Sequence, residues 1–397
     1  MYGVNKTKRR TRYMTDNNFR RLPVGIQSFK VIREENYLYV DKSDIVWNLV
    51  NLGEKYNYLS RPRRFGKSVL VNTLESYLEG RKDLFEGLKI MQLEKDWKQY
   101  PVIRLDMSRG GANEETLRSY LNLRFKDYEE KYNITPDPTA MLADRFHAII
   151  ATAYKQSGLR VAVLIDEYDS PLQHSWRTPE HEKCTGVYRE VFAILKADDE
   201  YEQFVFITGI TKFTQISLFS VLNNLTNISF MPEYAAICGI TEEEIKENFM
   251  PELKQMSEVN NWSVQETHDR LKAYYDGYHF SRRNMVDVYN PYSLVNALKS
   301  KEIINFWASS GATSLLPKFV DNAELRISNF ENIRIMRNTL ELSDVSGGGA
   351  ELFLYQSGYL TIKDSDEFGY ILGFPNEEVK QALYEEGKGL LDWKRAE

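Results

Sequence analysis

The sequence predicts an α/β protein with a doubly wound parallel sheet, followed by a mainly helical C-terminal region. Four short apolar runs have the length of strands. The clearest is 161–165, where five apolar residues in a row are typical of a strand buried on both faces of a parallel sheet. Helical segments alternate with these runs, as a doubly wound sheet requires. At 397 residues, the chain is long enough for two or three domains with a sizeable core.

The first half of the chain gives the elements of this sheet in order. A helical or extended lead-in is expected over 29–41. The predicted strands are 56–59, 101–106, 161–165 and 203–209. The predicted helices are 43–52, 67–79, 114–132 and 140–156. Gly53 and Gly80 follow the first two of these helices, where a C-cap glycine is common.

The second half of the chain changes to a helical pattern. Thr241 and Glu244 have the spacing of a capping box, so a helix is expected to start there. Two more helices are predicted over 263–274 and 290–298. The many aromatic residues of this half are interpreted as core, and stacking against nucleic-acid bases is the alternative that uses the same residue types.

These patterns divide the chain into four predicted parts. They are a basic leader at 1–21, expected to be a disordered tail, a core at 22–231, a helical lid or second domain at 232–345, and a linker with a truncated C-terminal segment at 346–397.

A candidate phosphate-binding loop follows the first predicted strand. Residues 60–68 read Ser-Arg-Pro-Arg-Arg-Phe-Gly-Lys-Ser, which has the spacing of G-x-x-x-x-G-K-[ST] with Arg61 in place of the first glycine. Gly66 lets the backbone approach a phosphate, Lys67 can reach the β and γ oxygens, and Ser68 can ligate Mg²⁺. The candidate nucleotide-binding residues are Arg61, Pro62, Arg63, Arg64, Phe65, Gly66, Lys67 and Ser68.

Two carboxylates follow the strand at 161–165. In phosphate-loop nucleotidases a buried strand ends in this way at the Walker B position, where Asp166 would hold Mg²⁺ together with Ser68. Glu167 would then act on the attacking water as the catalytic base. A solvated Asp-Glu pair at a strand end is the simpler alternative.

Thr208 closes the last predicted strand with a small hydroxyl side chain. Because ligands bind at the carboxyl ends of strands in open α/β sheets, Thr208 is a candidate catalytic residue that senses the γ-phosphate or orients the water. A threonine that caps the strand for local reasons is the alternative.

The ordered motifs resemble the predicted AAA-ATPase-like family of bacteria. The resemblance runs from about residue 22 to about residue 375, and its further segments are 22–27, 37–42, 208–213, 238–241 and 275–278. It implies an ATP- and Mg²⁺-dependent ATPase, and family members also carry arginine at the first glycine position. Members are usually longer and end in a PD-(D/E)XK-type nuclease domain, which is expected to be missing here.

This resemblance also suggests the class of the sheet. A strand at 101–106 comes in sequence between the loop strand and the acidic strand. With the family analogy, it favours the additional-strand class, in which the acid after the Mg²⁺ ligand acts on water.

The remaining arginines leave alternatives open. Arg64 is the one in the loop most expected to touch nucleotide, whereas the other interpretation is that Arg63 and Arg64 pair with acids such as Asp169 or Glu167. Arginines 282 and 283 are further candidates for a finger on the transferred phosphate, but nothing in the sequence selects them.

Composition limits the classes of partner. The formal net charge is -6, from 51 Lys and Arg against 57 Asp and Glu, which argues against binding nucleic acid through bulk charge. Two cysteines without a C-x-x-C pair argue against structural zinc and disulfides and fit a reducing cytoplasm. No apolar run approaches the ~20 residues that span a bilayer. A cytoplasmic protein that does not enter a membrane is expected.

Three functions remain in competition at this stage. The first is an ATPase whose lid moves and acts on a partner or nucleic acid. The second is an ATP-dependent switch or interaction module with negligible turnover. The third is a nuclease-associated scaffold in which Arg61 closes the loop. DNA, a protein and a second copy of the chain are the partners considered, besides the nucleotide.

Overall fold

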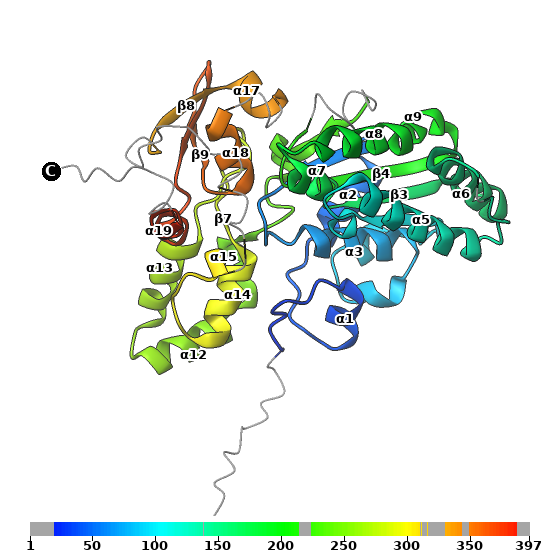
Figure 1. The fold of residues 1–397 in the computed structure, drawn as a ribbon. Coiled ribbons are helices and arrows are strands. Elements are labelled where there is room, and N and C mark those ends of the chain that lie inside the picture. The colour runs from blue at the N-terminus through cyan, green and yellow to red at the C-terminus, as the bar shows by residue number, and fades with distance from the viewer. Residues whose placement is uncertain are drawn as a thin grey trace, which may run out of the picture.

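A five-stranded parallel sheet forms the centre of the computed structural model (Figure 1). The structure describes residues 20–137, 139–213, 224–309, 311, 316, 330–343 and 349–386. The sheet strands are β1 (Tyr56–Ser60), β2 (Val102–Asp106), β3 (Val161–Asp166), β4 (Glu202–Gly209) and β5 (Thr226–Asn227). Their order is β2-β3-β4-β1-β5, and every neighbouring pair is parallel. All six residues of β3 are buried, as its unbroken apolar run predicts.

The sheet order confirms the additional-strand class. β4 lies between β1 and β3, with Ile207 paired to Tyr58 on one side and to Ile165 on the other. The strand that comes between β1 and β3 in sequence is β2, and it lies at the edge beyond β3. The prediction of the class was therefore right, although it depended on β2 and the inserted strand is β4. Sequence order does not fix the order of strands in a sheet.

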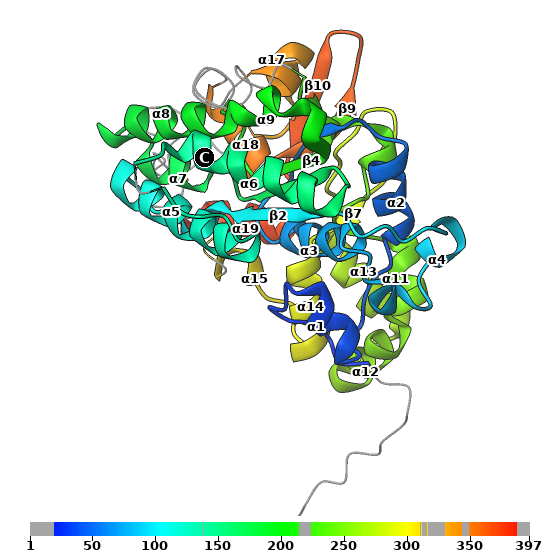
Figure 2. The ribbon, with the colours of Figure 1, turned by 90° about the vertical axis from the view of Figure 1, so that its right-hand side faces the viewer.

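Helices cover both faces of this sheet. In Figures 1 and 2, α8 and α9 lie above the strands and α3 lies below them. The helices of this half are α1 (Phe29–Glu34), α2 (Ser43–Asn51), α3 (Lys67–Leu78), α4 (Ile90–Leu93), α5 (Glu114–Lys131), α6 (Leu142–Ser157), α7 (Ser170–Ser175), α8 (Glu180–Phe192) and α9 (Ile194–Ala197). The helices predicted at 43–52, 67–79, 114–132 and 140–156 correspond to α2, α3, α5 and α6, within two residues at each end. The segments α7 to α9 were not predicted.

The later half is helical with two small antiparallel sheets. Its first helices are α11 (Glu242–Asn248), α12 (Met250–Asn260), α13 (Val264–Tyr275), α14 (Pro291–Ser300) and α15 (Phe306–Ser309), with β6 (Ile240–Thr241) paired to β7 (Val288–Tyr289). The capping box is present, since Thr241 Oγ1 accepts from the Glu244 N–H at 3.3 Å and Glu244 Oε2 accepts from the Thr241 N–H at 2.8 Å.

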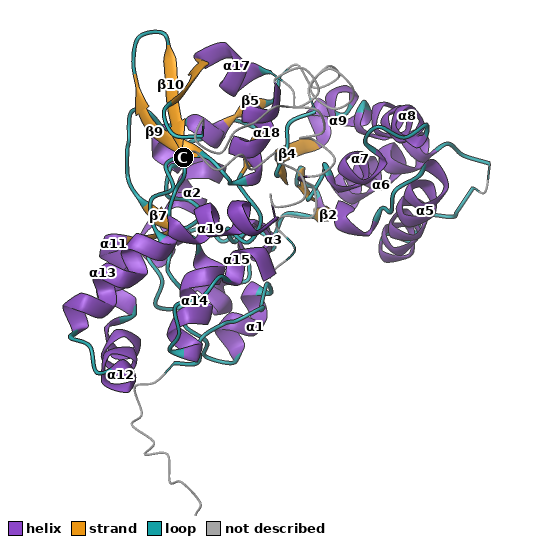
Figure 3. Cartoon of the chain, turned by 60° about the vertical axis from the view of Figure 1, so that its left-hand side comes forward, coloured by secondary structure: helices purple, strands orange, loops and turns teal. Residues whose placement is uncertain are grey.

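A second small sheet, which the sequence did not predict, follows these helices. Its order is β8-β10-β9, from β8 (Ile333–Met336), β9 (Thr361–Ser365) and β10 (Gly369–Gly373). The accompanying helices are α17 (Arg337–Leu342), α18 (Gly349–Ser357) and α19 (Glu377–Glu386). Figure 3 shows the β9–β10 hairpin beside α17 and α18. We call residues 330–386 the C-terminal module.

Two clusters of buried apolar side chains hold the chain together. The larger one joins both faces of the five-stranded sheet with the C-terminal module, and ring contacts from Phe230 to Tyr355 and Tyr370 are part of this junction. The smaller one lies among α11 to α14 and includes Leu38 from the lead-in. The boundaries of the four predicted parts stay predictions.

Two of the sequence predictions concern residues beyond the described ranges. Of the predicted leader at 1–21, only Arg20 and Arg21 lie within the described ranges. The part of the predicted C-terminal segment after residue 386 lies outside them. Within the described ranges, no helix combines the length and the apolar character needed to cross a bilayer.

Candidate functional site

The predicted phosphate-binding loop connects β1 to α3 at the carboxyl edge of the sheet. Gly66 is the N-cap of α3 and has φ 87°, in the left-handed region where glycine is favoured. A Cβ built on Gly66 would meet no atom within 4 Å, so the space in front of this turn is open. The first N–H groups of a helix have no partner within the helix, and in α3 these groups follow directly after Gly66. Such a helix start is suited to an anion.

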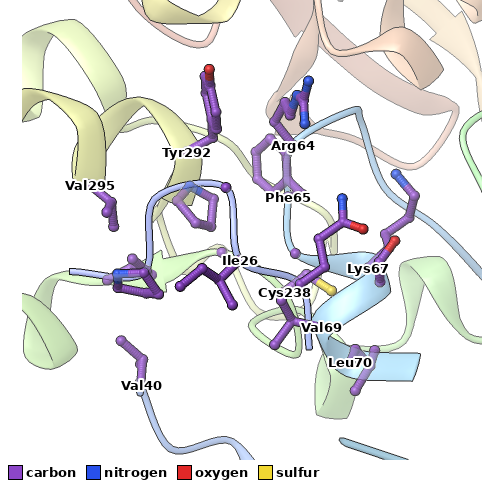
Figure 4. A pocket seen from close by; sticks show the side chains of 18 of the residues that line it. Ile26, Val40, Arg64, Phe65, Lys67, Val69, Leu70, Cys238, Tyr292 and Val295 are labelled. Atoms are coloured by element: carbon purple, nitrogen blue, oxygen red, sulfur yellow. The ribbon is translucent and has the colours of Figure 1, made fainter. Parts of the chain in front are cut away.

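A cavity of about 470 Å³ lies beside the loop (Figure 4). Most of its walls come from four parts of the chain, which are the lead-in at 23–27 and 38–42, the loop and the first turns of α3 at 63–70, residues 237–240, and α14. The segment after β3 adds Glu167, Ser170 and His174. In Figure 4, Ile26 lies between the loop and the helix that carries Tyr292 and Val295. The cavity is therefore closed by elements that are far apart in the sequence.

Lys67 is buried at the start of α3. Its Nζ donates to the carbonyl oxygens of Arg61 at 2.8 Å and Pro62 at 2.9 Å. Burial lowers the pKa of Lys67, and the carboxylates of Glu167, Asp169 and Asp166 act in the opposite direction. The ammonium group thus stands within electrostatic range of the acids that follow β3.

Asp166 ends β3 and has 2% of its surface exposed. Burial raises the pKa of its carboxyl to about 6, while hydrogen bonding to the Ser68 side chain and the charges of Lys67 and Arg104 act against this rise. Arg104 on β2 places Nη2 3.9 Å from Asp166 Oδ2. The structure thus brings Lys67, Ser68 and Asp166 together, as the two sequence motifs predicted.

These residues suit a magnesium ion. Mg²⁺ prefers oxygen ligands and is commonly held by one or two protein groups together with substrate phosphates. The hydroxyl of Ser68 and the carboxyl of Asp166 are two such oxygen donors in contact with each other, directly beside the open space at Gly66. Among the described residues there is no group of three or more His, Cys, Asp or Glu side chains that could hold a metal without a substrate.

Glu167 lines the cavity with a strained backbone. Its φ is 47°, and its N–H donates to Asp166 Oδ1 at 3.0 Å. A side chain other than glycine in this region costs on the order of 1 kcal/mol, and such strain gathers at functional sites. The local turn places the half-buried Glu167 at the cavity wall, next to the buried Asp166.

Thr208 is completely buried at the end of β4. Its Oγ1 donates to the Leu59 carbonyl at 2.9 Å, which ties β4 to β1, and the residue is not part of the cavity wall. Of the two interpretations of Thr208, the structure therefore favours a threonine that caps the strand over a catalytic residue.

The side chains of the three loop arginines point to different parts of the structure. The Arg61 side chain turns away from the cavity into the interior, and its main-chain carbonyl accepts a hydrogen bond from Lys67. Arg63 Nη1 donates to the Gly311 carbonyl at 2.8 Å. The Arg64 guanidinium lies over the Tyr292 ring at 5.0 Å, and both residues line the cavity. Arginines 282 and 283 do not belong to the cavity wall.

Comparison with known proteins decides the family. A family model described as predicted AAA-ATPase matches residues 23–219. An uncharacterized protein in the vnfD 5' region of Azotobacter chroococcum mcd 1 is 33% identical over 375 residues, which cover 92% of this chain and 69% of that protein.

The chain belongs to the predicted AAA-ATPase family.

Two solved structures are more distant. The Aeropyrum pernix ORC1 protein in complex with DNA has 14% identity and a TM-score of 0.30, with 86% of this chain and 90% of that chain covered. Cdc6p from Pyrobaculum aerophilum has 12% identity and a TM-score of 0.26, with 88% and 96% covered. TM-scores of this size carry no inference about function.

Asp169 has a structural role that the sequence did not indicate. Its Oδ2 accepts hydrogen bonds from the N–H groups of Ile210 at 3.0 Å and Thr211 at 2.6 Å, and from Thr211 Oγ1 at 2.6 Å. A Cβ on Gly209 would come within 2.4 Å of Asp169 Oδ1, so glycine is required there. Asp169 therefore fastens the end of β3 to the end of β4 and does not pair with the loop arginines.

The apolar end of the cavity was also not predicted from the sequence. Its side chains come from the lead-in, the segment before β6 and helix α14, and they are Val24, Ile26, Val40, Ile237, Cys238, Tyr292 and Val295. The resemblance at 22–27 was noticed in the sequence, but no local motif says that this segment faces α14. A contact between segments so distant in the chain is visible only in the folded molecule.

Proposed function

We propose that the protein binds ATP together with Mg²⁺ and hydrolyses it. The observation that supports this most directly is the meeting of Lys67, Ser68 and Asp166 at the N-terminus of α3, beside a cavity with an apolar end. Membership of the predicted AAA-ATPase family supports the same function.

The polar and apolar ends of the cavity suggest how ATP lies in it. The apolar side chains around Ile26 and Val295 would enclose the base. The phosphates would lie over the first N–H groups of α3, and Lys67 would exchange its two carbonyl partners for phosphate oxygens. Ser68 and Asp166 would hold Mg²⁺, which when bound neutralises charge on the β and γ phosphates.

Glu167 is the proposed catalytic base. Its carboxylate accepts a proton from water while the water oxygen forms a bond to the γ-phosphorus. The bond from that phosphorus to the bridging oxygen of ADP breaks, so the products are ADP and inorganic phosphate. The position of Glu167 in the cavity wall supports this role, and the strained turn fixes that position.

Two variants separate binding from chemistry. Lys67→Ala should weaken ATP binding about 100-fold or more, because the phosphates lose their nearest cation. Glu167→Gln should keep the affinity and lower turnover by roughly 10²- to 10⁴-fold, because it removes the base alone. The measurements are equilibrium titration with a fluorescent ATP analogue and single-turnover hydrolysis of ATP. The matched control is Glu182→Gln on the exposed face of α8, which should behave as wild type.

The outcomes distinguish the proposed ATPase from a switch. Binding without single-turnover hydrolysis in the wild type would leave a nucleotide-dependent switch. Equal hydrolysis by Glu167→Gln and the wild type would exclude Glu167 as the base.

We further propose that the cycle moves the helical region and acts on a partner. The support is that α14 forms one wall of the cavity while most of the site belongs to the sheet half. A protein, DNA and a second copy of the chain are the partners to test. ATP hydrolysis with and without duplex DNA, and gel filtration with and without Mg·ATP, would show which of them responds.

A further inference from the structure

The first position of the phosphate loop does not need glycine in this protein. Left-handed φ values occur in the loop at Arg64, with 68°, and at Gly66, with 87°, whereas Arg61 does not have one. The usual benefit of glycine, access to this region, is therefore of no use at position 61. Something other than glycine must shape the entrance of the loop.

The Arg61 side chain is anchored behind the loop. Its Nη1 donates to the carbonyl oxygens of Ser60 at 2.8 Å and Ser229 at 2.9 Å, and Nη2 donates to the carbonyl of Tyr234 at 2.9 Å. The guanidinium carbon lies 4.1 Å from the centre of the Phe280 ring. Two of these carbonyls and the ring belong to segments that follow the sheet, so the anchor connects the loop to distant parts of the chain.

This anchor holds a charge in the interior. Arg61 is 1% exposed, and within the described part of the chain no carboxylate is close enough to form an ion pair with it. Burial lowers its pKa to about 10, which leaves it charged at neutral pH. A buried cation without a carboxylate partner is costly unless its donors are satisfied. The planar fork of arginine presents several donors in fixed directions, so that Nη1 and Nη2 satisfy three carbonyls at once. The buried Nε has no hydrogen-bond partner among the described residues.

A second contact supports the loop from the same side. A Cβ built on Gly358, which has φ 93°, would lie 2.6 Å from Pro62 Cβ and 2.9 Å from Pro62 Cγ. The Tyr278 hydroxyl donates to the Gly358 carbonyl at 3.2 Å, and the Tyr278 ring packs edge-on against Phe65 at 4.7 Å between ring centres. The C-terminal module thus touches the back of the loop at Pro62, with no room for even a methyl group.

We propose that Arg61 and Gly358 are positioning residues that set the shape of the phosphate loop from behind and so determine nucleotide affinity. Arg61 acts through its anchor, and Gly358 acts by letting the C-terminal module close against Pro62. In this proposal neither residue touches the nucleotide. This inference rests on the proposed nucleotide binding at Lys67.

Replacement of Arg61 by the usual glycine is the first test. Arg61→Gly restores the common form of the motif and removes the anchor, so ATP should bind on the order of tenfold more weakly or worse. Arg61→Lys keeps the charge but loses the fork, so its affinity should lie between those of Arg61→Gly and the wild type. Affinity of Arg61→Gly equal to or tighter than that of the wild type would overturn the proposal.

Gly358→Ala tests the second contact with a matched control. The control is Gly158→Ala at the end of α6, where φ is 68° and a Cβ would meet no atom within 4 Å. Both variants place alanine in left-handed backbone, so both should lower the thermal unfolding temperature. Gly358→Ala alone should also weaken binding of a fluorescent ATP analogue, by roughly tenfold, because its methyl group displaces Pro62.

A double-mutant cycle then separates the contact from general loss of stability. In Pro62→Gly the clashing atoms are absent, so Gly358→Ala should have much less effect on affinity in the Pro62→Gly background than in the wild type. Equal effects in the two backgrounds, or equal affinities of Gly358→Ala and Gly158→Ala, would contradict the proposal. The tests with Gly358→Ala, Gly158→Ala and Pro62→Gly do not depend on the Arg61 variants, so they decide the proposal even if Arg61→Gly does not fold. If the wild type itself does not bind ATP, the proposed function fails as well; if it binds and the variants match it, this inference alone fails.

Discussion

Asp169 illustrates how a single side chain fixes the edge where the site is built. Its carboxylate is 1% exposed and receives hydrogen bonds from the end of β4. An asparagine keeps the size but offers a neutral oxygen and an added donor, so Asp169→Asn should lose about 2 kcal/mol or more of unfolding free energy. Urea denaturation would measure this loss, with Asp127→Asn on the exposed face of α5 as the control. A loss below the scatter of the control would mean that the hydrogen bonds do not stabilise the edge.

Glu202 shows a different effect of burial, at the other end of β4. Its Oε2 accepts a hydrogen bond from the Tyr56 hydroxyl at 2.7 Å. Burial raises the pKa of Glu202 from 4.5 to about 8. The charges of Asp198 and Asp199 also raise this pKa, whereas the charge of Lys55 lowers it. The folded protein therefore binds more protons than the unfolded chain between these pH values, so this contribution to stability is present at low pH and is lost as the pH rises toward 8. Glu202→Gln, which keeps an acceptor for Tyr56, should remove it.

The expected size of this pH effect is on the order of 2 kcal/mol between pH 6 and pH 8. Urea denaturation at the two pH values should show that the free energy of unfolding falls less from pH 6 to pH 8 in Glu202→Gln than in the wild type. Glu200→Gln, an exposed neighbour, is the control and should keep the full fall. An identical fall in all three proteins would assign the pH dependence to other groups.

Helix α14 connects helix capping to the cavity. Asn290 is fully buried at its N-cap, and Oδ1 accepts from the N–H groups of Tyr292 at 3.0 Å and Ser293 at 3.2 Å. Asn290→Ala should cost about 1 to 2 kcal/mol of unfolding free energy and also weaken ATP binding, because Tyr292 and Val295 on this helix line the cavity. Thermal unfolding and nucleotide titration are the measurements.

The conservative variant at this position gives the control. Asn290→Ser keeps a good capping side chain and should retain most of both properties. If Asn290→Ala lost stability but kept full affinity, α14 would not shape the nucleotide site.

The elements differ in how well the sequence predicted them. The loop, the acidic strand and the helices α2, α3, α5 and α6 follow local rules of periodicity, capping and spacing, so each could be predicted from a short window. The neighbour of β1 in the sheet could not be predicted, because strand order depends on long-range packing. The inference of the sheet class depended on β2, whereas β4 is the strand that lies between β1 and β3. The small sheet of the C-terminal module was missed for a similar reason, since its strands are short and pair across turns and intervening helices.

The residues of the candidate site also differ in how well the sequence predicted their positions. Lys67, Ser68 and Asp166 were predicted to converge because carboxyl ends of parallel strands share an edge. The burial of the Arg61 side chain in the interior was not predicted, since its partners at Ser229 and Tyr234 are more than 160 residues away in the sequence. The predicted catalytic role of Thr208 depended on the strand end alone, which does not tell which way a buried hydroxyl points.

For the molecule as a whole, the cavity lies between the two apolar clusters. The loop and Cys238 belong to the larger cluster, while Leu38, Ile240 and Val295 belong to the smaller one. A ligand that contacts both should connect them, so Mg²⁺ with a non-hydrolysable ATP analogue should slow amide hydrogen exchange in 22–27 and 290–298 as well as in 60–70. Protection confined to 60–70 would mean that nucleotide does not bridge the clusters, and Lys67→Ala should show no protection anywhere.

The two carbonyl partners of Lys67 have a consequence for the selectivity of the whole protein. Because its ammonium group already donates to Arg61 and Pro62, an incoming anion gains only the difference between its own oxygens and those carbonyls. Chloride or sulfate, which is too compact to reach several of these groups at once, has little to gain from that exchange. A polyphosphate chain long enough to reach the helix N-terminus, the lysine and the acidic edge together gains at several points at once. For the proposed binding of ATP, small ions should therefore compete only weakly with the triphosphate at this loop.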